Sequence, residues 1–111
     1  MPADLNHLTL SGRLARDPVL CVLPSGHTVC DLLVACHYRA RDDHSGAWRE
    51  HTDFVPVRTF GFQARTACDH LRKGRQVSLV GRICSRRVPE DGSDRWVTEM
   101  IAQAVQFGER S

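Results

Sequence analysis

Two aromatic rings and one cation, Phe54, Arg58 and Phe60, occupy alternating positions in one short stretch of the chain. In an extended strand this spacing places all three side chains on one face, and it places Val55 and Val57 on the other. Rings on which bare bases stack, and cations that neutralise phosphates, are the two requirements for sequence-tolerant binding of single-stranded nucleic acid. The pattern predicts such a binding face. The alternative is that both phenylalanines are core residues.

The middle of the chain carries a cationic run, although the net charge of the whole chain is only +2. From Arg58 to Arg87, eight Arg and Lys residues are accompanied by Asp69 alone, which gives a net charge of +7. Such a cluster is typical of proteins that bind polyanions, although a solvated basic face has the same composition. We expect Arg82 and Arg86, on the strand that follows the predicted helix, to extend the binding face.

The sequence contains no motif that would support enzymatic or metal chemistry. It lacks GxxxxGK[ST], GxGxxG, HExxH and GxSxG. The six histidines form no i,i+4 pair, and the five cysteines contain no CxxC. Cys30 and Cys36 would lie about 20 Å apart on one strand, too far for a disulfide. We therefore expect no enzyme, no metal and no cofactor, and five reduced cysteines with structural roles.

The elements that must position these residues follow from hydrophobic periodicity and turn residues. A stripe of Ala64, Ala67, Cys68 and Leu71 predicts a short amphipathic helix, with Arg72 and Lys73 in its last turn and Gly74 as its C′ residue. The predicted strands are Leu8–Leu14 with a continuation at Val19–Leu23, Thr28–Arg39, Trp48–Phe60, Gln76–Arg87 and Arg95–Val105. Gly12 marks a bend or a close approach, Pro56 indicates an edge or bulged segment, and Ile83 is expected to face inward.

Five strands with one helix between the third and the fourth are the element order of an oligonucleotide-binding (OB) barrel, an all-β fold. Polar turns at Asp42–Gly46 and Pro89–Gly92 predict two long hairpins that project from the barrel as arms. Trp48 and Trp96 fall on these hairpins, where an exposed indole indicates a nucleic-acid ligand or a subunit contact. The alternative is that both rings fill the ends of the barrel.

The 111 residues are enough for one domain, residues 1–111, with a modest core that self-association would supplement. No run of 18 apolar residues is present, so no membrane span is expected. The first residues lack the basic and apolar regions of a secretory signal. We therefore expect a cytoplasmic protein.

The motifs taken together resemble those of the bacterial single-stranded DNA-binding protein (SSB) family. The opening stretch Leu8–Pro18 resembles the first-strand motif L-x-G-x-L-x-x-D-P, and Val77–Arg87 resembles V-x-V-x-G-x-L-x-x-R. Further similarity comes from Pro24–Gly26, Arg41–Thr52, Phe54–Gly61, His70–Gly74, Trp96–Glu99 and Val105–Phe107. The resemblance covers about residues 5–107.

The resemblance implies an OB-fold homo-oligomer, usually a tetramer, with a dimer as the alternative. It also implies binding of single-stranded DNA in replication, recombination or repair, beside the nucleoid. Phe54 and Phe60 fall on positions that the family stacks against bases. The whole set of expected DNA contacts is Tyr38, Arg41, Trp48, Phe54, Arg58, Phe60, Arg72, Lys73, Arg82, Arg86 and Trp96.

Two departures from the family pattern motivate alternatives. Two habitual aromatic positions hold Ala40 and Val88, for which Tyr38 and Trp96 are the candidate replacements. Replicative members also carry a tail with an acidic tip that recruits replication and repair proteins, whereas this sequence reaches Ser111 without one. We expect a trimmed chain or a short paralogue. The alternative functions are a primosome-type module that contacts proteins and an OB module that binds RNA.

Overall fold

The computed structural model describes residues 4–107, so residues 108–111, where the question of a tail falls, lie outside the described part. Within this range, six strands form one sheet, and one helix follows the fourth strand. The elements are β1 (Leu8–Leu14), β2 (Val19–Val22), β3 (Thr28–Arg41), β4 (Trp48–Phe60), α1 (Gly61–His70), β5 (Gln76–Glu90) and β6 (Ser93–Phe107).

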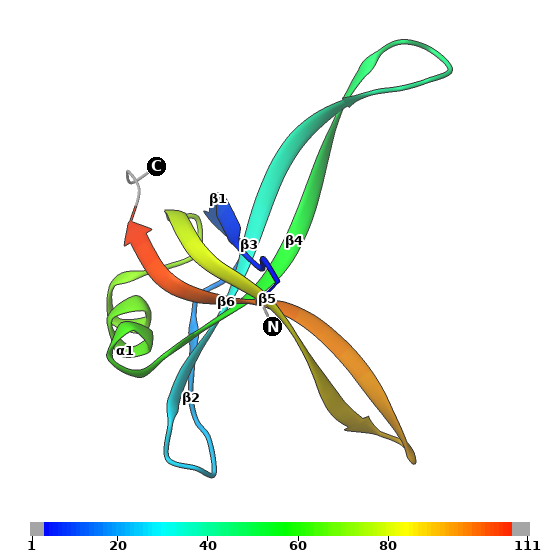
Figure 1. Cartoon of the computed structure of the whole chain (residues 1–111). Helices are drawn as coiled ribbons and strands as arrows, with labels where there is room; N and C mark the ends of the chain where they lie inside the picture. Colours follow the sequence, from blue (N-terminus) through cyan, green and yellow to red (C-terminus); the bar gives the residue numbers. More distant parts are fainter. Residues whose placement is uncertain (1–3, 108–111) are drawn as a thin grey trace.

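The sheet closes into a barrel because β1 pairs with two strands. It lies antiparallel to β5 and then reaches β3, where Arg13 pairs with Ala35 and Leu14 with Val34. The β5–β6, β6–β4 and β4–β3 ladders complete a closed ring of five strands (Figure 1). β2 continues from β1 along the same edge of β3. The predicted five-stranded OB barrel with a single helix between the third and fourth of these strands is confirmed.

The core lies inside the barrel and under α1, and strand alternation decides which residues reach it. On β4, Val57 and Thr59 are buried whereas Phe54 and Phe60 are exposed, as the period of two requires. The other buried hydrophobic members are Leu14, Cys30, Leu32, Val34, Ala64, Ala67, Leu71, Val77, Leu79, Met100 and Ala102. The hydroxyl of Thr59 is buried and has no hydrogen-bond partner among the described residues.

Gly12 is required where β1 crosses from β5 to β3. A Cβ atom at this position would lie 2.4 Å from the backbone oxygen of Ala35, far inside van der Waals contact. Only glycine lets the two backbones approach this closely, so the predicted close approach is confirmed. Pro56 lies just before the short parallel ladder between β4 and β6, which covers only Val57 and Arg58. β4 therefore has an unpaired edge beside Pro56, as the missing amide proton of proline requires.

The two predicted hairpins project from the barrel as arms, as Figure 1 shows. The β3–β4 arm is paired as far as Arg41 and Trp48, and the β5–β6 arm as far as Glu90 and Ser93. The second turn is tighter than predicted. Pro89 and Glu90 belong to β5, and only Asp91 and Gly92, both with positive φ, form the turn. This is the backbone that a two-residue Asp-Gly hairpin turn needs.

The prediction for the end of the helix was wrong. α1 ends at His70, so Arg72 and Lys73 lie beyond it, and Gly74 is not its C′ residue. The reason is Leu71, which turns to an extended conformation and enters the core with no exposed surface. Gly74, with φ of 90°, donates its amide to the backbone oxygen of Leu14 and so serves a turn that joins the loop to β1.

The prediction that Ile83 faces the interior was also wrong, since 47% of its surface is exposed. Alternation along β5 holds through Val77, Leu79 and Gly81, which are buried. Beyond Gly81 the β5–β6 ladder leaves the barrel and becomes the arm, so the Ile83 side chain is no longer enclosed by the barrel. Periodicity gives the face on which a residue lies, but not where along the strand the barrel ends.

Candidate nucleic-acid interface

The outer face of β4 presents the two phenylalanines to solvent. Phe54 is 60% exposed and Phe60 is 41% exposed, so the alternative in which both rings are core residues is excluded. Neighbouring Val57 and Thr59 point to the opposite side and hold this part of β4 in the core. A ring anchored in this way is held outward at little entropic cost, which suits it to stack on a flat ligand.

Arg58 lies between the two rings and belongs to a row of side chains that crosses four strands. Strand register pairs it with Asp31 on β3 and with Ile101 on β6, and Ile101 pairs in turn with Arg82 on β5. Because paired residues share one face of a sheet, these four side chains lie on the same outer surface. The structure therefore places Arg82, a predicted DNA contact, on the same outer surface as the exposed residues of β4.

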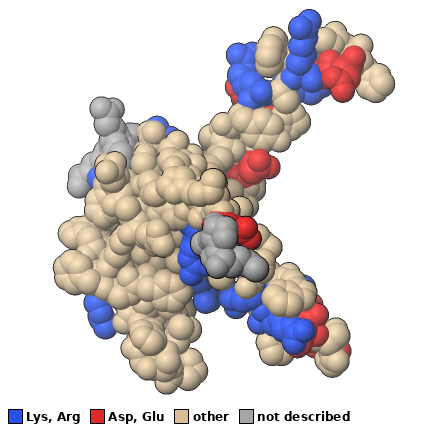
Figure 2. Space-filling view, viewed as in Figure 1, with Lys and Arg blue, Asp and Glu red and all other residues tan. Residues whose placement is uncertain are grey.

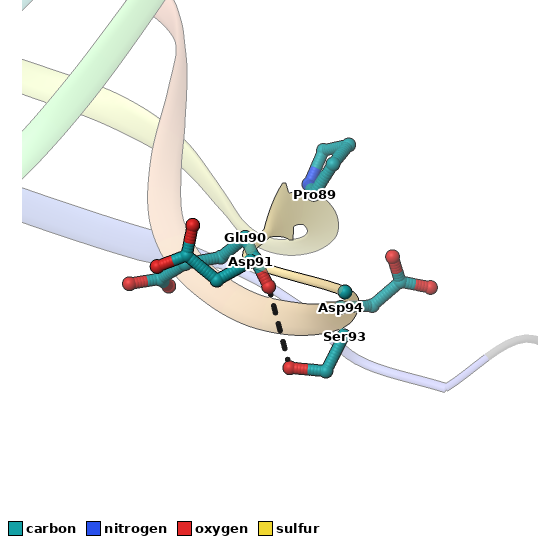
Figure 3. Close-up of a pocket in the computed structure, with 6 residues that line it drawn as sticks. Pro89, Glu90, Asp91, Ser93 and Asp94 are labelled. Atoms are coloured by element: carbon teal, nitrogen blue, oxygen red, sulfur yellow. Dashed lines mark hydrogen bonds between the residues drawn. The ribbon is translucent and has the colours of Figure 1, made fainter.

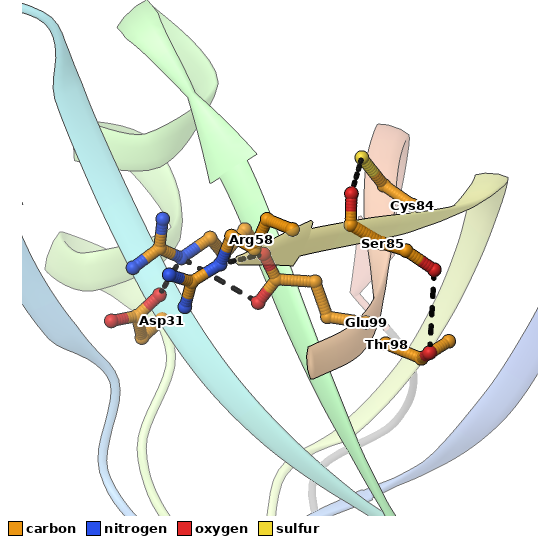
Figure 4. A network of polar contacts seen from close by, with 7 residues as sticks. Asp31, Arg58, Cys84, Ser85, Thr98 and Glu99 are labelled. Carbon is orange, nitrogen blue, oxygen red and sulfur yellow. Dashed lines mark hydrogen bonds and ion pairs between the residues drawn. The ribbon is translucent and has the colours of Figure 1, made fainter. Parts of the chain in front are cut away.

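The guanidinium of Arg58 takes part in a network of ion pairs (Figure 4). Its Nε atom donates to Asp31 Oδ1 at 2.9 Å and lies 3.7 Å from Glu99 Oε2. The Nε atom of Arg86 donates to Glu99 Oε1 at 2.7 Å. The Glu99 side chain is only 5% exposed, whereas those of Arg58 and Arg86 are 20% and 41% exposed. Two predicted phosphate contacts are thus partly neutralised by a buried carboxylate.

A hollow of about 170 Å³ lies over this network. It brings in Arg16, a cation that the sequence did not suggest, so that three arginines face two carboxylates and the hollow keeps a net charge of +1. The full lining is Arg16, Asp31, Leu32, Pro56, Val57, Arg58, Arg86, Val97 and Glu99. Pro56 and Val97 supply apolar walls beside the cations.

Both tryptophans lie on the arms and are open to solvent, so neither fills an end of the barrel. Trp48 is 60% exposed and Trp96 is 62% exposed. Arg39 lies over the Trp48 ring at 5.6 Å, and Arg87 over the Trp96 ring at 5.2 Å. Each arm therefore carries an indole already paired with a cation, which is a surface that accepts bases and phosphates together.

The two candidate replacements for missing aromatics have different outcomes. Tyr38 is on the same face of β3 as Ala40, two residues away, and stacks on His51 with ring centroids 5.1 Å apart. Trp96 pairs with Arg87, one residue from Val88, and so points to the other face of the β5–β6 arm. Tyr38 therefore lies on the same face as the position that it was predicted to replace, whereas Trp96 lies on a different face from Val88.

Of three other predicted DNA contacts, Arg41 and Arg72 have side-chain bonds within the protein. Arg41 donates from Nε to the backbone oxygen of Gly46 in the turn of the β3–β4 arm, at 3.0 Å. Arg72 donates to the carbonyls of Cys68 and Leu71, as a cation at a helix end does. Arg72 and Lys73 follow α1, which lies on the side of the barrel away from the arms (Figure 1). The structure does not bring this pair together with the β4 face.

Charge is concentrated on the arms and at the base of the β5–β6 arm, while the barrel surface in the same view is mostly uncharged (Figure 2). Arg82 is exposed and forms no ion pair with any residue of the range 4–107. Arg87 and Arg95 are paired with Asp94 and Glu90 across the arm. Arg82 is therefore less compensated than Arg58 and Arg86, which are paired with Asp31 and Glu99.

The tip of the β5–β6 arm contains a hollow of about 430 Å³ that does not suit DNA (Figure 3). Its lining includes Glu90, Asp91 and Asp94 and no cation. The Ser93 hydroxyl donates to the Glu90 carbonyl at 3.3 Å and closes the turn. Glu90 and Asp94 are paired with Arg95 and Arg87, so the tip of the arm adds no net positive charge to the interface.

Neither a metal centre nor a membrane helix appears in the part of the chain that the structure describes. Residues 4–107 contain no group of three His, Cys, Asp or Glu side chains arranged to hold a metal ion. No helix in that range has the length and apolar character needed to cross a bilayer. Its five cysteines are all free thiols.

The sequence did not reveal the role of Glu99, Asp31 or Arg16. Each is isolated among neighbours of other types, and each gains its role from a strand distant in the sequence. The one available signal was the alternation of side chains along β6. It places Glu99 on the same face as Ile101, and Ile101 lies beside Arg58.

A closed five-stranded barrel whose open face carries rings and cations defines the class of OB-fold nucleic-acid-binding proteins. A known protein family of this class matches the sequence. The sequence model of the Single-strand binding protein family matches residues 5–108, and the chain belongs to that family.

Single-stranded DNA-binding protein 2 of Clostridium acetobutylicum is 33% identical over 105 residues, which are 93% of this chain and 76% of that protein. Among solved structures, a deletion mutant of the single-stranded DNA binding protein from Thermus aquaticus superposes with a TM-score of 0.83 at 30% identity. The match covers 95% of this chain and 51% of the Thermus chain, so this chain spans about half its length. The Plasmodium falciparum SSB complex with ssDNA has the same fold, with a TM-score of 0.85 at 24% identity, over 98% of this chain and 99% of that one.

Proposed function

We propose that this chain binds single-stranded DNA without regard to sequence, protects it during replication, recombination or repair, and catalyses no reaction. The observation that carries the proposal is the exposure of Phe54 and Phe60 on either side of Arg58. Exposed rings gain stability when they stack on bases, and every base offers a flat face. Family membership and the named relatives support the same function.

The path that we propose for the strand starts on the face of β4 and continues across the row to Arg82. Phe54 and Phe60 stack on bases, while Arg82 and Arg58 contact phosphates. The indole rings on the two arms extend the surface beyond the barrel. Arg72 and Lys73 lie outside this path and contribute only through the overall field.

We also propose that the chain acts as a homo-oligomer, a tetramer or a dimer. The support is an apolar surface on β2, where Val19, Leu20 and Val22 are 47%, 42% and 65% exposed. Light scattering with and without a long dT oligomer would give the number of subunits and the capture of the strand together. Recruitment of replication or repair proteins, and a cytoplasmic location beside the nucleoid, remain predictions.

The test removes both rings. The double variant Phe54→Ala/Phe60→Ala should lose affinity for labelled dT and mixed-sequence oligomers by at least about 30-fold, since each lost stack costs 1 kcal/mol or more. Fluorescence anisotropy measures this loss. Phe62→Ala is the matched control, because Phe62 is 85% exposed but belongs to α1. Unchanged affinity of the double variant would sink the assignment of the interface.

Salt dependence tests the phosphate contacts separately from the rings. Arg82→Ala should reduce the slope of log affinity against log salt by about 0.7, the value for one phosphate on a single strand. Arg72→Ala is the control, since its guanidinium is bonded to carbonyls at the end of α1. Equal slopes for wild type and Arg82→Ala would remove Arg82 from the proposed path.

A module that contacts proteins is the second candidate, favoured by the neutralised charge on Arg58 and Arg86 and by the non-aromatic Ala40 and Val88. Wild-type protein that captures no dT oligomer even at low salt would favour this candidate. Matched DNA and RNA oligomers in competition decide whether the ligand is RNA instead.

A further inference from the structure

Two thiols from distant parts of the sequence meet beside the core. Cys30 lies on β3 and has no exposed surface, while Cys68 lies on α1 and is half-buried. Their Sγ atoms are 2.8 Å apart although 38 residues separate them in the chain. β3 is paired along its whole length with β4, and the helix segment is held by buried Ala64 and Ala67. Both sulfurs are therefore fixed by rigid elements.

We propose that Cys30 and Cys68 form an intrachain disulfide when the folded protein meets a peroxide. The bond would join α1 to the barrel wall. A disulfide needs its sulfurs about 2.0 Å apart, so less than 1 Å of movement separates the free thiols from the bonded state. This inference does not depend on the proposed function.

The step begins at Cys68, which is the accessible member of the pair. Burial, together with the neighbouring Cys68 thiol, raises the pKa of Cys30, so Cys30 stays protonated. The Cys68 thiolate attacks hydrogen peroxide, its S–O bond forms as the O–O bond breaks, and the released hydroxide takes a proton to become water. The Cys30 sulfur then displaces the sulfenic hydroxyl, which leaves with the Cys30 proton as a second water. Two thiols have lost two electrons to one peroxide.

The other cysteines are placed less well to react with Cys68. Cys36 donates to the backbone oxygen of Ser11, and Cys84 lies far along β5. Cys21 is the nearest competitor, since it pairs with Val29, next to Cys30 in the chain. The Cys21 thiol also contributes to the raised pKa of Cys30, but the sulfur in contact with Cys30 is that of Cys68.

The disulfide would lie on the side of the sheet opposite the proposed DNA interface. Cys30 pairs with buried Thr59, whereas the neighbouring pair places Phe60 on the outer face. We therefore expect oxidation to stabilise the barrel, because it restricts the unfolded chain, and to leave the affinity for dT oligomers within about twofold. The melting temperature should rise by about 5–15 °C.

The experiment treats the dilute full-length protein with hydrogen peroxide, alkylates the remaining thiols and digests it for mass spectrometry. We expect a linked pair of peptides that contain Cys30 and Cys68, reversal by dithiothreitol, and the rise in melting temperature. Cys68→Ser should lose the linked peptides and the rise in melting temperature, and Cys84→Ser should keep these two effects. A Cys21–Cys68 link, a link between two chains, or oxidation of Cys68 beyond sulfenic acid with Cys30 still alkylated would each overturn the proposal.

Discussion

At the scale of single residues, Glu99 determines how much of the predicted positive charge reaches the surface. Its carboxylate lies between the Nε atoms of Arg86 and Arg58, at 2.7 and 3.7 Å. A buried carboxylate in this position orients both guanidinium groups and offsets their charge. Glu99 therefore both orients the arginines of the proposed DNA interface and reduces their net charge. A count of arginines in the sequence does not show this effect.

Glu99→Gln tests this balance. Loss of a buried partner leaves two cations without their counter-charge, and since both arginines are partly exposed we expect a loss of about 1–3 kcal/mol in the free energy of unfolding. Affinity for dT oligomers at low salt should rise. Urea unfolding and anisotropy measure the two effects. Glu90→Gln, which breaks the exposed pair with Arg95, should change neither. A Glu99→Gln protein as stable as wild type would contradict the network.

At the scale of elements, each arm depends on the chemistry of its turn. In the β3–β4 arm, Asp42 accepts a bond from the amide of His44 at 2.8 Å and is paired with Arg49 at 3.2 Å. The His44 amide, followed by Arg49, lowers the pKa of the Asp42 carboxyl below its ordinary value. The charged form therefore holds the arm in the geometry that presents Trp48.

Acid should loosen this arm. Because the pKa of Asp42 is lowered in the folded protein, its stabilisation is complete above the ordinary carboxyl pKa of about 3.9 and is lost as the pH falls through the lower folded value. We expect the amides of His44 and Gly46 to lose protection from exchange in that window, measured by NMR. Asp42→Asn should remove the transition, and Asp43→Asn in the same turn should keep it. A transition that persists in Asp42→Asn would assign it to another group.

At the scale of the whole molecule, closure of the barrel depends on close contact between backbones at two glycines. Gly12 meets the backbone of Ala35 on β3, and a Cβ at Gly81 would lie within 2.5 Å of the Ile101 oxygen on β6. Gly81 lies beside a register shift in the β5–β6 ladder, where the strand bends toward the arm. Neither pair of backbones can move apart without a cost in free energy, because each backbone is held in place by the hydrogen bonds of its own strand ladder.

Gly12→Ala should destabilise the protein by about 1–3 kcal/mol, the usual cost of overpacking, because β1 must move away from β3. Urea unfolding followed by circular dichroism measures the loss. Ser11→Ala is the control, since it changes the neighbouring, exposed residue of β1. If Gly12→Ala were as stable as Ser11→Ala, β1 would close the barrel in some other way.

The sequence alone was enough to predict the fold and the face of β4, because both depend on local patterns. Alternation from Phe54 to Phe60 assigned two rings to the outside, and the order of strands and helix indicated the barrel. Turn residues also located both arms. These patterns extend over only a few residues, so they can be interpreted without knowing which residues pack against them.

Only the tertiary structure decided the features in which distant residues meet. Leu71 lies beyond the end of the helix and is buried in the core, and Ile83 is exposed because the barrel ends beside it. Glu99 reached Arg58 from another strand, and Cys68 reached Cys30 across 38 residues. Periodicity states which side of an element a residue occupies, whereas barrel closure determines what lies on that side. The physical reason is that such contacts are set by strand register, which no local pattern contains.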